Sequence, residues 1–421
     1  MEKFPSPVGR KLWASGKFSI PPRKSLSNEL HPRSQARVNL TGGVMSLELY
    51  DASTIDALDW PQTEEGEYAR NFLVPFIKNG SKYYIDNVDT QMMALKLDHN
   101  VIPITINEAE YDNSFICSPF SHYISYAFKV LDKFKKRYVR DSIYVFLTGF
   151  SKIMRKGKLN KVVIVNNWLF TTSPHVSLNK IQMETLTNFL KERFPSHAIV
   201  FRSVNAHIWK ESYPSLKHVG YDLIASRYVW ITNASKEEVF QTRICKSDMK
   251  FLRETKYRII EAEELTEADI PKIQELYSHL YIKKYSQINP QYNENYFRLV
   301  LKNKILRVKG IKQTEKLEGV VGYSYRNGVM ISSLFGYDPQ DTENKGVYRL
   351  LSTILMSEAK NNGGYYNQSA GGSFYKEIRR AEGHMEYTAV YAKHLSFARK
   401  LPWKLLKGVL NTFGPKFMKK Y

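Results

Sequence analysis

Cysteine is almost absent from this chain: only Cys117 and Cys245 occur among its 421 residues. Two cysteines cannot supply the disulfide framework of a secreted protein, and neither stands in a spacing typical of metal ligands. No pair of histidines offers such a spacing either. We therefore expect no metal site and a reducing compartment such as the cytosol.

Long hydrophobic runs are also missing. The most apolar stretches, at residues 161–170 and 197–204, have the length of strands, whereas a membrane-spanning helix needs about 20 apolar residues. The N-terminus is basic but lacks the continuous apolar core of a secretory signal. These absences predict a cytoplasmic protein and leave peripheral contact with the inner membrane surface open.

Acidic residues are scarce relative to basic ones. The chain has 41 Asp and Glu against 62 Lys and Arg, a formal net charge of +21. The excess favours an anionic partner but does not choose among a nucleotide cofactor, an acidic carrier protein, tRNA and an anionic membrane. A soluble protein with a charged surface and no such partner is the alternative.

The length exceeds what a single hydrophobic core usually supports, which predicts two domains. Residues 1–45 are rich in Pro, Ser and basic residues and are expected to form a mobile arm. We place an N-terminal domain at 46–240, a C-terminal domain at 241–394 and a tail at 395–421. The polar segment 233–254 is the natural boundary between the domains.

Helix and strand patterns alternate along both halves. In the first half we predict helices at 115–130, 141–153 and 177–193, a further helix ending near Leu216, and strands at 161–166, 198–202 and 221–231. The second half repeats the order, with strands at 328–335, 365–369 and 386–393 and helices at 346–359 and 373–381. Gly220 and Gly383, about 165 residues apart, are predicted to stand at the same place in the two copies, between a helix and the strand that follows it. This order predicts an α/β fold of two tandem domains, each a mixed central sheet flanked by helices.

The start of the helix at Gly346 is a candidate binding site, because unpaired N–H groups at a helix N-terminus bind anions. Glycine would let a phosphate approach the backbone, and flanking basic residues add positive charge; the candidate set is Lys345, Gly346, Val347, Tyr348 and Arg349. A glycine in this position can also mark an ordinary turn. The equivalent segment of the first copy, 171–179, has no glycine, which favours the second copy.

A second candidate is the strand end and turn at residues 367–376 (NQSAGGSFYK). Asn367 and Ser369 are candidate substrate-binding residues in a run of small residues that permits close backbone approach, and Tyr375 could protonate a leaving thiolate. Lys376 adds an ammonium group beside it. In the alternative, the glycines shape a tight turn and the basic side chains face water.

Residues 281–292 (YIKKYSQINPQY) form a polar, aromatic segment that could line an acceptor pocket, with Lys284, Tyr285 and Asn289 as candidate contacts. An ordinary helix end would look much the same. The tail after residue 395 alternates basic with aromatic and aliphatic residues and contains no acid. That pattern suits either an anionic membrane surface or a helix docked on its own domain.

The motif KEIRRAEG at 376–383, after NQSAG at 367–371 and before EYTAVY at 386–391 and His394, resembles the GNAT superfamily and, within it, the Fem-like group with duplicated domains. Similar stretches lie at 165–169, 194–204, 220–227 and 284–291, and the likeness covers about residues 50–400. It implies a donor held between two diverging strands, with its pyrophosphate at Lys345, Gly346, Val347 and Tyr348.

The resemblance also implies direct attack by an amine on a thioester or ester carbonyl, without a covalent enzyme intermediate. Tyr375 falls near the family's usual phenol, and Lys376 matches a lysine that recurs in Fem-like chains. One departure matters: the usual acetyl-CoA loop has two glycines, whereas residues 344–347 (NKGV) have one. This leaves room for a longer acyl chain, a carrier-protein thioester or an aminoacyl-tRNA.

We therefore expect an enzyme, an N-acyltransferase that uses acyl-CoA or an acyl-carrier-protein thioester and no metal. The acceptor would be a primary amine on a small molecule, a lipid or a peptide. Asp338 or water would take the proton of the amine, and Tyr375 would give one to the sulfur. The alternatives are an aminoacyltransferase that depends on charged tRNA, and a non-catalytic protein of a membrane surface or scaffold.

Overall fold

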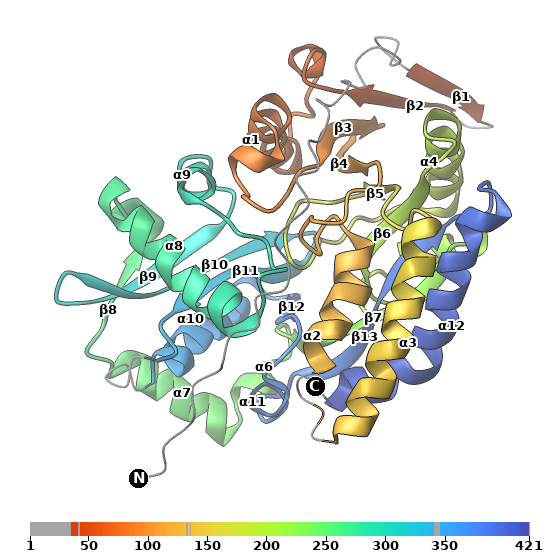
Figure 1. Cartoon of the computed structure of the whole chain (residues 1–421). Coiled ribbons are helices and arrows are strands. Elements are labelled where there is room, and N and C mark those ends of the chain that lie inside the picture. The colour runs from red at the N-terminus through yellow and green to blue at the C-terminus, as the bar shows by residue number, and fades with distance from the viewer. Residues whose placement is uncertain (1–34, 41–42, 132–133, 135, 341–345, 421) are drawn as a thin grey trace.

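A computed structural model describes residues 35–40, 43–131, 134, 136–340 and 346–420 (Figure 1). Their strands form one mixed sheet in the order β1-β2-β3-β4-β5-β6-β13-β7-β12-β11-β10-β9-β8. The strands are β1 (Gln35–Leu40), β2 (Gly43–Tyr50), β3 (Gln91–Leu97), β4 (Asn100–Asn107), β5 (Val162–Val165), β6 (Ala198–Val204), β7 (Asp222–Asn233), β8 (Arg258–Glu261), β9 (Arg307–Gln313), β10 (Lys316–Arg326), β11 (Val329–Tyr337), β12 (Tyr365–Asn367) and β13 (Glu382–Tyr391).

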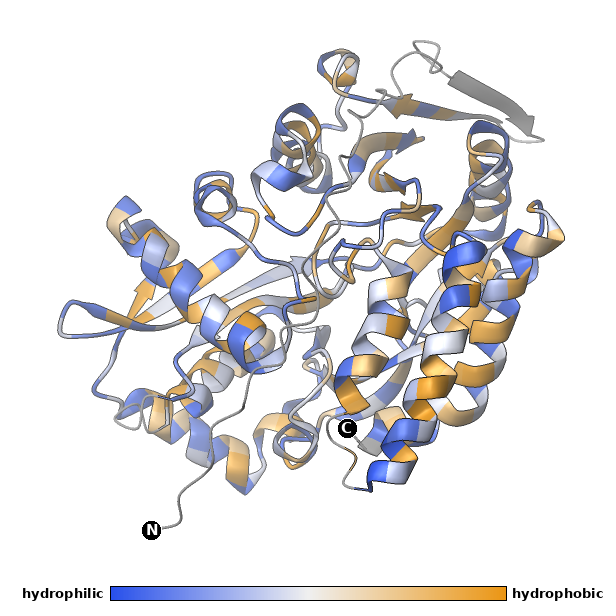
Figure 2. Cartoon of the chain, viewed as in Figure 1, coloured by the Kyte–Doolittle hydropathy of each residue, from blue (hydrophilic) through white to orange (hydrophobic). Residues whose placement is uncertain are grey.

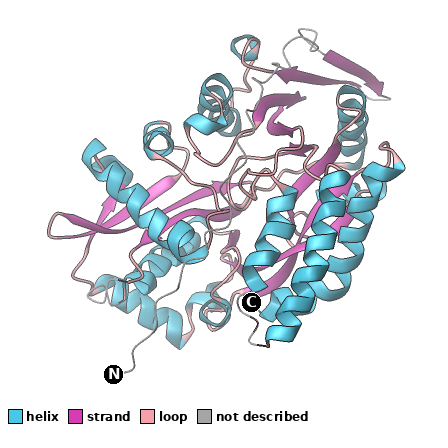
Figure 3. Cartoon of the chain, viewed as in Figure 1, coloured by secondary structure: helices cyan, strands magenta, loops and turns pink. Residues whose placement is uncertain are grey.

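Helices cover both faces of this sheet (Figure 3). They are α1 (Glu64–Asn79), α2 (Tyr126–Val130), α3 (Arg137–Lys156), α4 (Lys180–Arg193), α5 (Ser212–Val219), α6 (Glu237–Phe240), α7 (Arg243–Arg253), α8 (Ile270–Ser278), α9 (Glu294–Lys302), α10 (Val347–Asn362), α11 (Ser373–Glu377) and α12 (Phe397–Lys420). Two π-helical segments, η4 (Ser121–Ser125) and η8 (His279–Tyr285), precede α2 and follow α8. The predicted α/β class is confirmed.

The core follows from the alternation of side chains along the strands. On β6, Ile199 and Phe201 join the cluster under α4 and α5, while Ala198 and Val200 join the cluster on the opposite face. That second cluster continues under α1, α8 and α9, so the two halves of the sequence share one apolar layer. A third cluster packs α10 against β10 and β11.

The two halves repeat one strand order and exchange their last strands. β5 pairs parallel with β6, and β11 pairs parallel with β12. The next strand along the sequence does not complete its own half: β13 pairs with β6, and β7 pairs with β12. β7 and β13 then pair with each other, antiparallel, at the centre of the sheet. The predicted boundary near residue 240 therefore divides the sequence but not the sheet.

A shared backbone feature marks the repeat. The last parallel pairs are Val165 with Phe201 and Ile331 with Asn367. Two residues beyond each pair stands a serine in the left-handed region, Ser203 at φ 57° and Ser369 at φ 59°. A non-glycine residue rarely adopts this conformation, so its recurrence at equivalent points indicates that both strands turn away in the same manner.

The glycine punctuation predicted for the two copies is wrong in the second one. Gly220 ends α5 in the left-handed conformation, at φ 94°. Gly383 instead lies inside β13, which begins four residues earlier than predicted. The position equivalent to Gly220 is Arg380, which has φ 64°. An arginine therefore adopts the left-handed conformation at this turn. The sequence comparison, which searched for a glycine, selected Gly383 instead.

The halves differ most in the connection from β4 to β5 in the first half and from β10 to β11 in the second. A tight turn at Asn327 and Gly328 joins β10 to β11, whereas residues 108–161 separate β4 from β5. This longer segment contains η4, α2 and α3. The predicted helix at 115–130 is shorter than expected, since it starts only at residue 119 and continues as the π-helical segment η4 before α2.

Three further segments differ from the predictions. α4 begins after Asn179, whose side chain accepts a hydrogen bond from Gln182 N, so Asn179 and not Ser177 is the N-cap. The segment 233–254, expected as a link, forms α6 and α7 and packs against α10. Of the predicted arm, residues 1–34 and 41–42 lie outside the described residues, while 35–40 form β1.

The tail forms helix α12, one side of which is docked on the protein. Trp403 and Leu406 of α12 are 2% and 1% exposed. Asn411 accepts a hydrogen bond from Ala225 N and donates one to Leu223 O, both at 2.8 Å. These backbone groups belong to the part of β7 that β12 does not reach, so α12 closes an open strand edge. In the part of the chain that the structure describes, no helix is long and apolar enough to cross a membrane.

Trp403→Ala tests this docking. Removing a buried indole should lower the free energy of unfolding by about 3–5 kcal/mol, measured by urea titration. The matched change Phe413→Ala removes a ring that is 70% exposed, and it should cost about 0.5 kcal/mol or less. Equal, small effects of the two changes would show that α12 is not held on the sheet.

Candidate functional site

The parallel strands β11 and β12 part soon after they meet. They pair only from Val329 with Tyr365 to Ile331 with Asn367, although β11 runs on to Tyr337. Beyond that point β11 keeps its pairing with β10, and Gln368 and Ser369 bond with Trp230 of β7. Each strand thus has one bonded edge and one edge that faces the divergence, where backbone groups are available to a ligand.

Among the residues that the structure describes, no side chain caps the N-terminus of the helix that enters at this divergence. Gly346 is the N-cap of α10 in the left-handed conformation, φ 96°, with no side-chain cap. The first intrahelical bond runs from Leu350 N to Gly346 O, so the amides of the three preceding residues point out of the helix end. The first turn holds no acidic residue.

The equivalent helix of the first half is closed. At the start of α4, Asn179 accepts from Gln182 N, and the Gln182 side chain accepts from Asn179 N. This reciprocal capping box satisfies the end of the helix from within the chain. Among the described residues, the two copies therefore differ in the capping of this helix: α4 is capped and α10 is not.

The predicted donor residues lie around this end of α10, in different surroundings. Val347 is fully buried in the core. The guanidinium of Arg349 bonds Asp248 at 2.6 Å and lies 4.8 Å from the ring centre of Phe251, so a carboxylate already balances its charge. Phe251 also packs beside Gly346, where a Cβ would lie 3.0 Å from the ring. Lys345 lies outside the described residues.

Tyr348 and Tyr375 are brought together, with ring centres 4.9 Å apart. The guanidinium of Arg379 lies 3.4 Å from the ring centre of Tyr375 and is itself paired with the buried Asp248. Burial raises the pKa of Tyr375 to about 12, although the charge of Arg379 opposes the rise. The phenol is therefore protonated at neutral pH, and its raised pKa makes it a weaker acid than an exposed tyrosine.

Asp338, predicted as a proton acceptor, follows the last residue of β11. Its carboxylate accepts from Gln340 N at 2.9 Å and pairs with His279 Nδ1 at 3.2 Å. The backbone bond from Gln340 and the neighbouring His279 hold the pKa of Asp338 below its usual value. These contacts make Asp338 a weak base and let it fix the position of η8.

Lys376 is buried, and its ammonium donates to the carbonyls of Gln368, Ser369 and Ala370 at 2.6, 3.2 and 3.0 Å. It therefore holds the turn that follows β12, including its left-handed serine. Burial and the charge of Arg227 lower the pKa of Lys376 to about 7, while the three carbonyls favour the ammonium form. Asn367, also buried, supports the same turn by accepting from Ser369 N at 2.9 Å.

The three residues predicted to contact the acceptor are not gathered at one point. Asn289 donates to Tyr281 O at 2.7 Å and so closes the end of η8. Lys284 is exposed on η8 beside Tyr285. Tyr285 is 56% exposed, and its phenol lies near that of Tyr126 on α2.

A pocket that the sequence did not reveal lies in the first half. It is a shallow hollow over β6, β13 and β7, with about 360 Å³ of empty space when the part open to solvent is included. Arg202, Arg227 and Glu386 supply polar walls. The pocket is covered by His122 and Tyr123 of η4 and by residues that precede η4. Burial and the charge of Arg227 lower the pKa of His122 well below its usual value.

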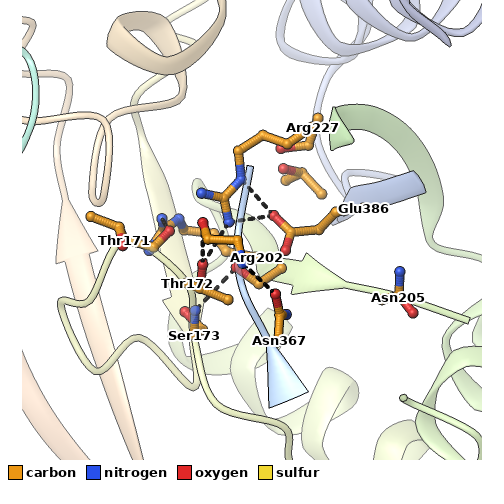
Figure 4. Close-up of polar contacts among 12 residues, drawn as sticks. Thr171, Thr172, Ser173, Arg202, Asn205, Arg227, Asn367 and Glu386 are labelled. Atoms are coloured by element: carbon orange, nitrogen blue, oxygen red, sulfur yellow. Dashed lines mark hydrogen bonds and ion pairs between the residues drawn. The ribbon is translucent and has the colours of Figure 1, made fainter. Parts of the chain in front are cut away.

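A β-bulge builds the charged wall of this pocket. Between Glu386 and Tyr387 the pairing with β7 slips by one residue, so Ser226 and Arg227 both reach the pocket. Arg227 stands opposite Glu386 and donates to its Oε1 from Nε at 2.8 Å and Nη2 at 2.6 Å (Figure 4). Oε2 of Glu386 is buried and has no partner in the described residues.

The pocket connects directly to the predicted site. Arg227 also donates to Thr172 Oγ1 at 3.1 Å, and Thr172 Oγ1 lies 3.2 Å from Ser369 Oγ (Figure 4). Arg202 donates to Asn167 and to the carbonyls of Phe170 and Thr171, and burial lowers its pKa to about 10. An arginine at an inward position of the apolar strand AIVFR was the signal that could have predicted this pocket. No group of three or more potential metal ligands occurs in the residues that the structure describes.

No family model and no curated protein matches the sequence. Solved structures with a similar fold include FemX, at 9% identity over 78% of this chain and 94% of that one, with a TM-score of 0.47. Others are the C-terminal domain of a putative lysylphosphatidylglycerol synthetase from Agrobacterium fabrum (10% identity, 62% of this chain and 91% of that chain, TM-score 0.40) and a GCN5-related N-acetyltransferase from Kribbella flavida (7%, 55% and 81%, 0.31). These likenesses concern the fold alone.

Replacing Lys376 by Met tests its buried state. With a pKa near 7, the folded chain binds one proton fewer than the unfolded chain between about pH 7 and pH 10. This lysine then makes the free energy of unfolding rise with pH, by up to about 1.4 kcal/mol per unit. The wild type should therefore gain stability relative to Lys376→Met as pH rises from about 7.5 to 9.5. A difference that does not change with pH would show that the carbonyls retain the proton.

Proposed function

We propose that the chain is an acyltransferase that moves an acyl group from a thioester donor to a primary amine, with the donor bound where β11 and β12 diverge. The observation that carries the proposal is the contrast between the open end of α10 and the capped end of α4. Of the two equivalent sites, the one at Gly346 offers free amides and a glycine for an anionic carrier group.

The free edge of β11 would hold the arm of the donor. Its backbone groups beyond Ile331 face the divergence and can bond amides of a pantetheine-like chain, which places the thioester near the end of β12. A backbone N–H there would stabilise the carbonyl oxygen as charge develops on it. The protein would thus contribute mainly the positioning of two reactants.

The reaction would be a direct transfer. The amine nitrogen bonds to the carbonyl carbon, the carbon–sulfur bond breaks, and the sulfur leaves as a thiolate that takes a proton from Tyr375. The proton of the amine passes to Asp338, directly or through a water molecule; the contacts of Asp338 lower its pKa, which makes it a modest base. The pocket at Arg227 and Glu386 is the proposed acceptor site, since Ser369 joins it to the end of β12.

Gly346→Val tests the donor site. A valine would be strained at φ 96° and would meet Phe251, so the helix end should close and co-purifying acyl thioesters should disappear from the mass spectrum. Gly363→Ala is the matched control. It places a side chain at a positive φ, 70°, at the other end of the same helix, and donor retention should survive it. Retention by Gly346→Val would refute the placement.

Tyr375→Phe tests the proton donor. Phenylalanine keeps the ring contacts with Arg379 and Tyr348, so a fall in kcat of about tenfold with little change in KM is expected. The effect is modest because a thiolate leaves readily. Tyr365→Phe, which removes a hydroxyl from β12, should leave kcat unchanged. Turnover should be measured with acyl-CoA and, separately, with aminoacyl-tRNA; exclusive use of the latter would assign the aminoacyl reaction.

A further inference from the structure

Three helices on one side of the molecule carry most of its exposed apolar side chains. Of the thirteen large hydrophobic residues found exposed among the described residues, nine lie on α2, α3 and α12, which have 5, 20 and 24 residues. They are Tyr126, Tyr138, Tyr144, Val145, Phe146, Ile153, Phe397, Phe413 and Phe417. A soluble surface seldom gathers so many in so little sequence.

The helices lie side by side (Figure 1). Arg399 of α12 donates to the carbonyl of Gly157 at the end of α3, and a Cβ on Gly157 would collide with Pro402. At the opposite end, the rings of Phe134 and Phe417 stack at 6.4 Å. α3 and α12 are therefore antiparallel neighbours, and the ring of Tyr144 also contacts Phe128 of α2.

The same helices carry more than half of the net positive charge of the chain. Together they contain thirteen Lys and Arg and a single acid, Asp141. The net charge of the whole chain is +21, so these three helices hold more than half of the excess. Figure 2 shows hydrophilic and hydrophobic residues interleaved along them.

The apolar residues are not remnants of a core face. On α3, Leu147, Phe150 and Met154 are buried against the protein, whereas Val145 is 70% exposed. Tyr138 precedes Val145 by seven residues, which places both on one line of the helix, away from the buried stripe. The outer face of α3 thus presents aromatic and aliphatic groups to the surroundings.

We propose that α2, α3 and α12 form a surface that docks on an anionic lipid membrane. Lysine and arginine are attracted by the negative surface potential of such a membrane, and aromatic side chains settle at the depth of the headgroups. A nucleic acid would match the charge, but it would give no role to exposed aliphatic groups such as Val145 and Ile153. The combination of both kinds of residue selects the lipid surface.

The surface lies next to the proposed active site. Tyr126 of α2 is close to Tyr285 of η8, whose phenol in turn neighbours those of Tyr337 and Tyr348. Docking through these helices would bring the divergence of β11 and β12 near the membrane surface. The docking itself does not depend on the proposed reaction.

Co-sedimentation of the full chain with vesicles tests the proposal. Binding is expected to phosphatidylcholine vesicles that contain about one third phosphatidylglycerol, and it should weaken sharply as salt is raised. Pure phosphatidylcholine should bind far less. Failure to bind the anionic vesicles, or equal binding to both, would overturn the proposal.

Two independent pairs of changes locate the surface. Val145→Asp with Phe146→Asp removes exposed apolar groups, and Lys404→Glu with Lys416→Glu inverts exposed charge. Each pair should weaken binding about tenfold or more. The matched controls, Tyr83→Asp with Ile181→Asp and Lys82→Glu with Lys302→Glu, alter exposed residues elsewhere and should keep wild-type binding.

Circular dichroism and thermal melting of all four variants check that they are folded. If both test pairs bind vesicles as the wild type does, the surface is not the docking site. Binding of duplex RNA that is lost in the charge pair but kept in the apolar pair, together with weak vesicle binding, would assign the surface to nucleic acid and overturn the proposal.

Discussion

The antiparallel pairing of β7 with β13 is the contact on which the rest of the structure depends. Each strand is the last of its half in sequence, and each pairs with the half to which it does not belong. Because the exchange joins the halves through backbone hydrogen bonds, they cannot separate without breaking the sheet. The bulge within this pairing sets Arg227 opposite Glu386 and so defines the charged pocket.

The exchange also fixes what remains free. β7 takes the edge of β12 that faces the first half, and the part of β7 left uncovered is closed by Asn411 of α12. The unbonded strand edges at the centre are then those that face the divergence of β11 and β12. Backbone groups there need partners, and a ligand can supply them. Among the described residues, unequal capping of two equivalent helices thus distinguishes the candidate site at α10 from its counterpart at α4.

Much of the fold could be predicted from the sequence. The short apolar runs KVVIVN and AIVFR predicted two strands, and helix patterns located α3, α4 and α10. The strand exchange could not be predicted, because β7 and β13 read as ordinary strands and nothing local records their neighbours. The prediction of a left-handed turn at Gly383 was wrong for a related reason, because the residue that adopts this conformation is Arg380.

The candidate site was predictable only in part. Glycine at 346 pointed to an open helix end, and small residues at 369–372 pointed to a turn beside it. The roles of Arg349, Asp338 and Asn289 depend on partners distant in sequence, Asp248, His279 and Tyr281 O among them, which composition does not reveal. The pocket at Arg227 escaped notice because it needs a bulge and a strand from the other half.

Amide hydrogen exchange of the full chain, with and without acyl-CoA of short and long chain length, tests the central claim most directly. The account predicts slower exchange on donor addition in two places, the backbone of residues 332–337 on β11 and the first three amides of α10. Protection confined to β6 and β7 around Arg227, with no change at α10, would contradict it.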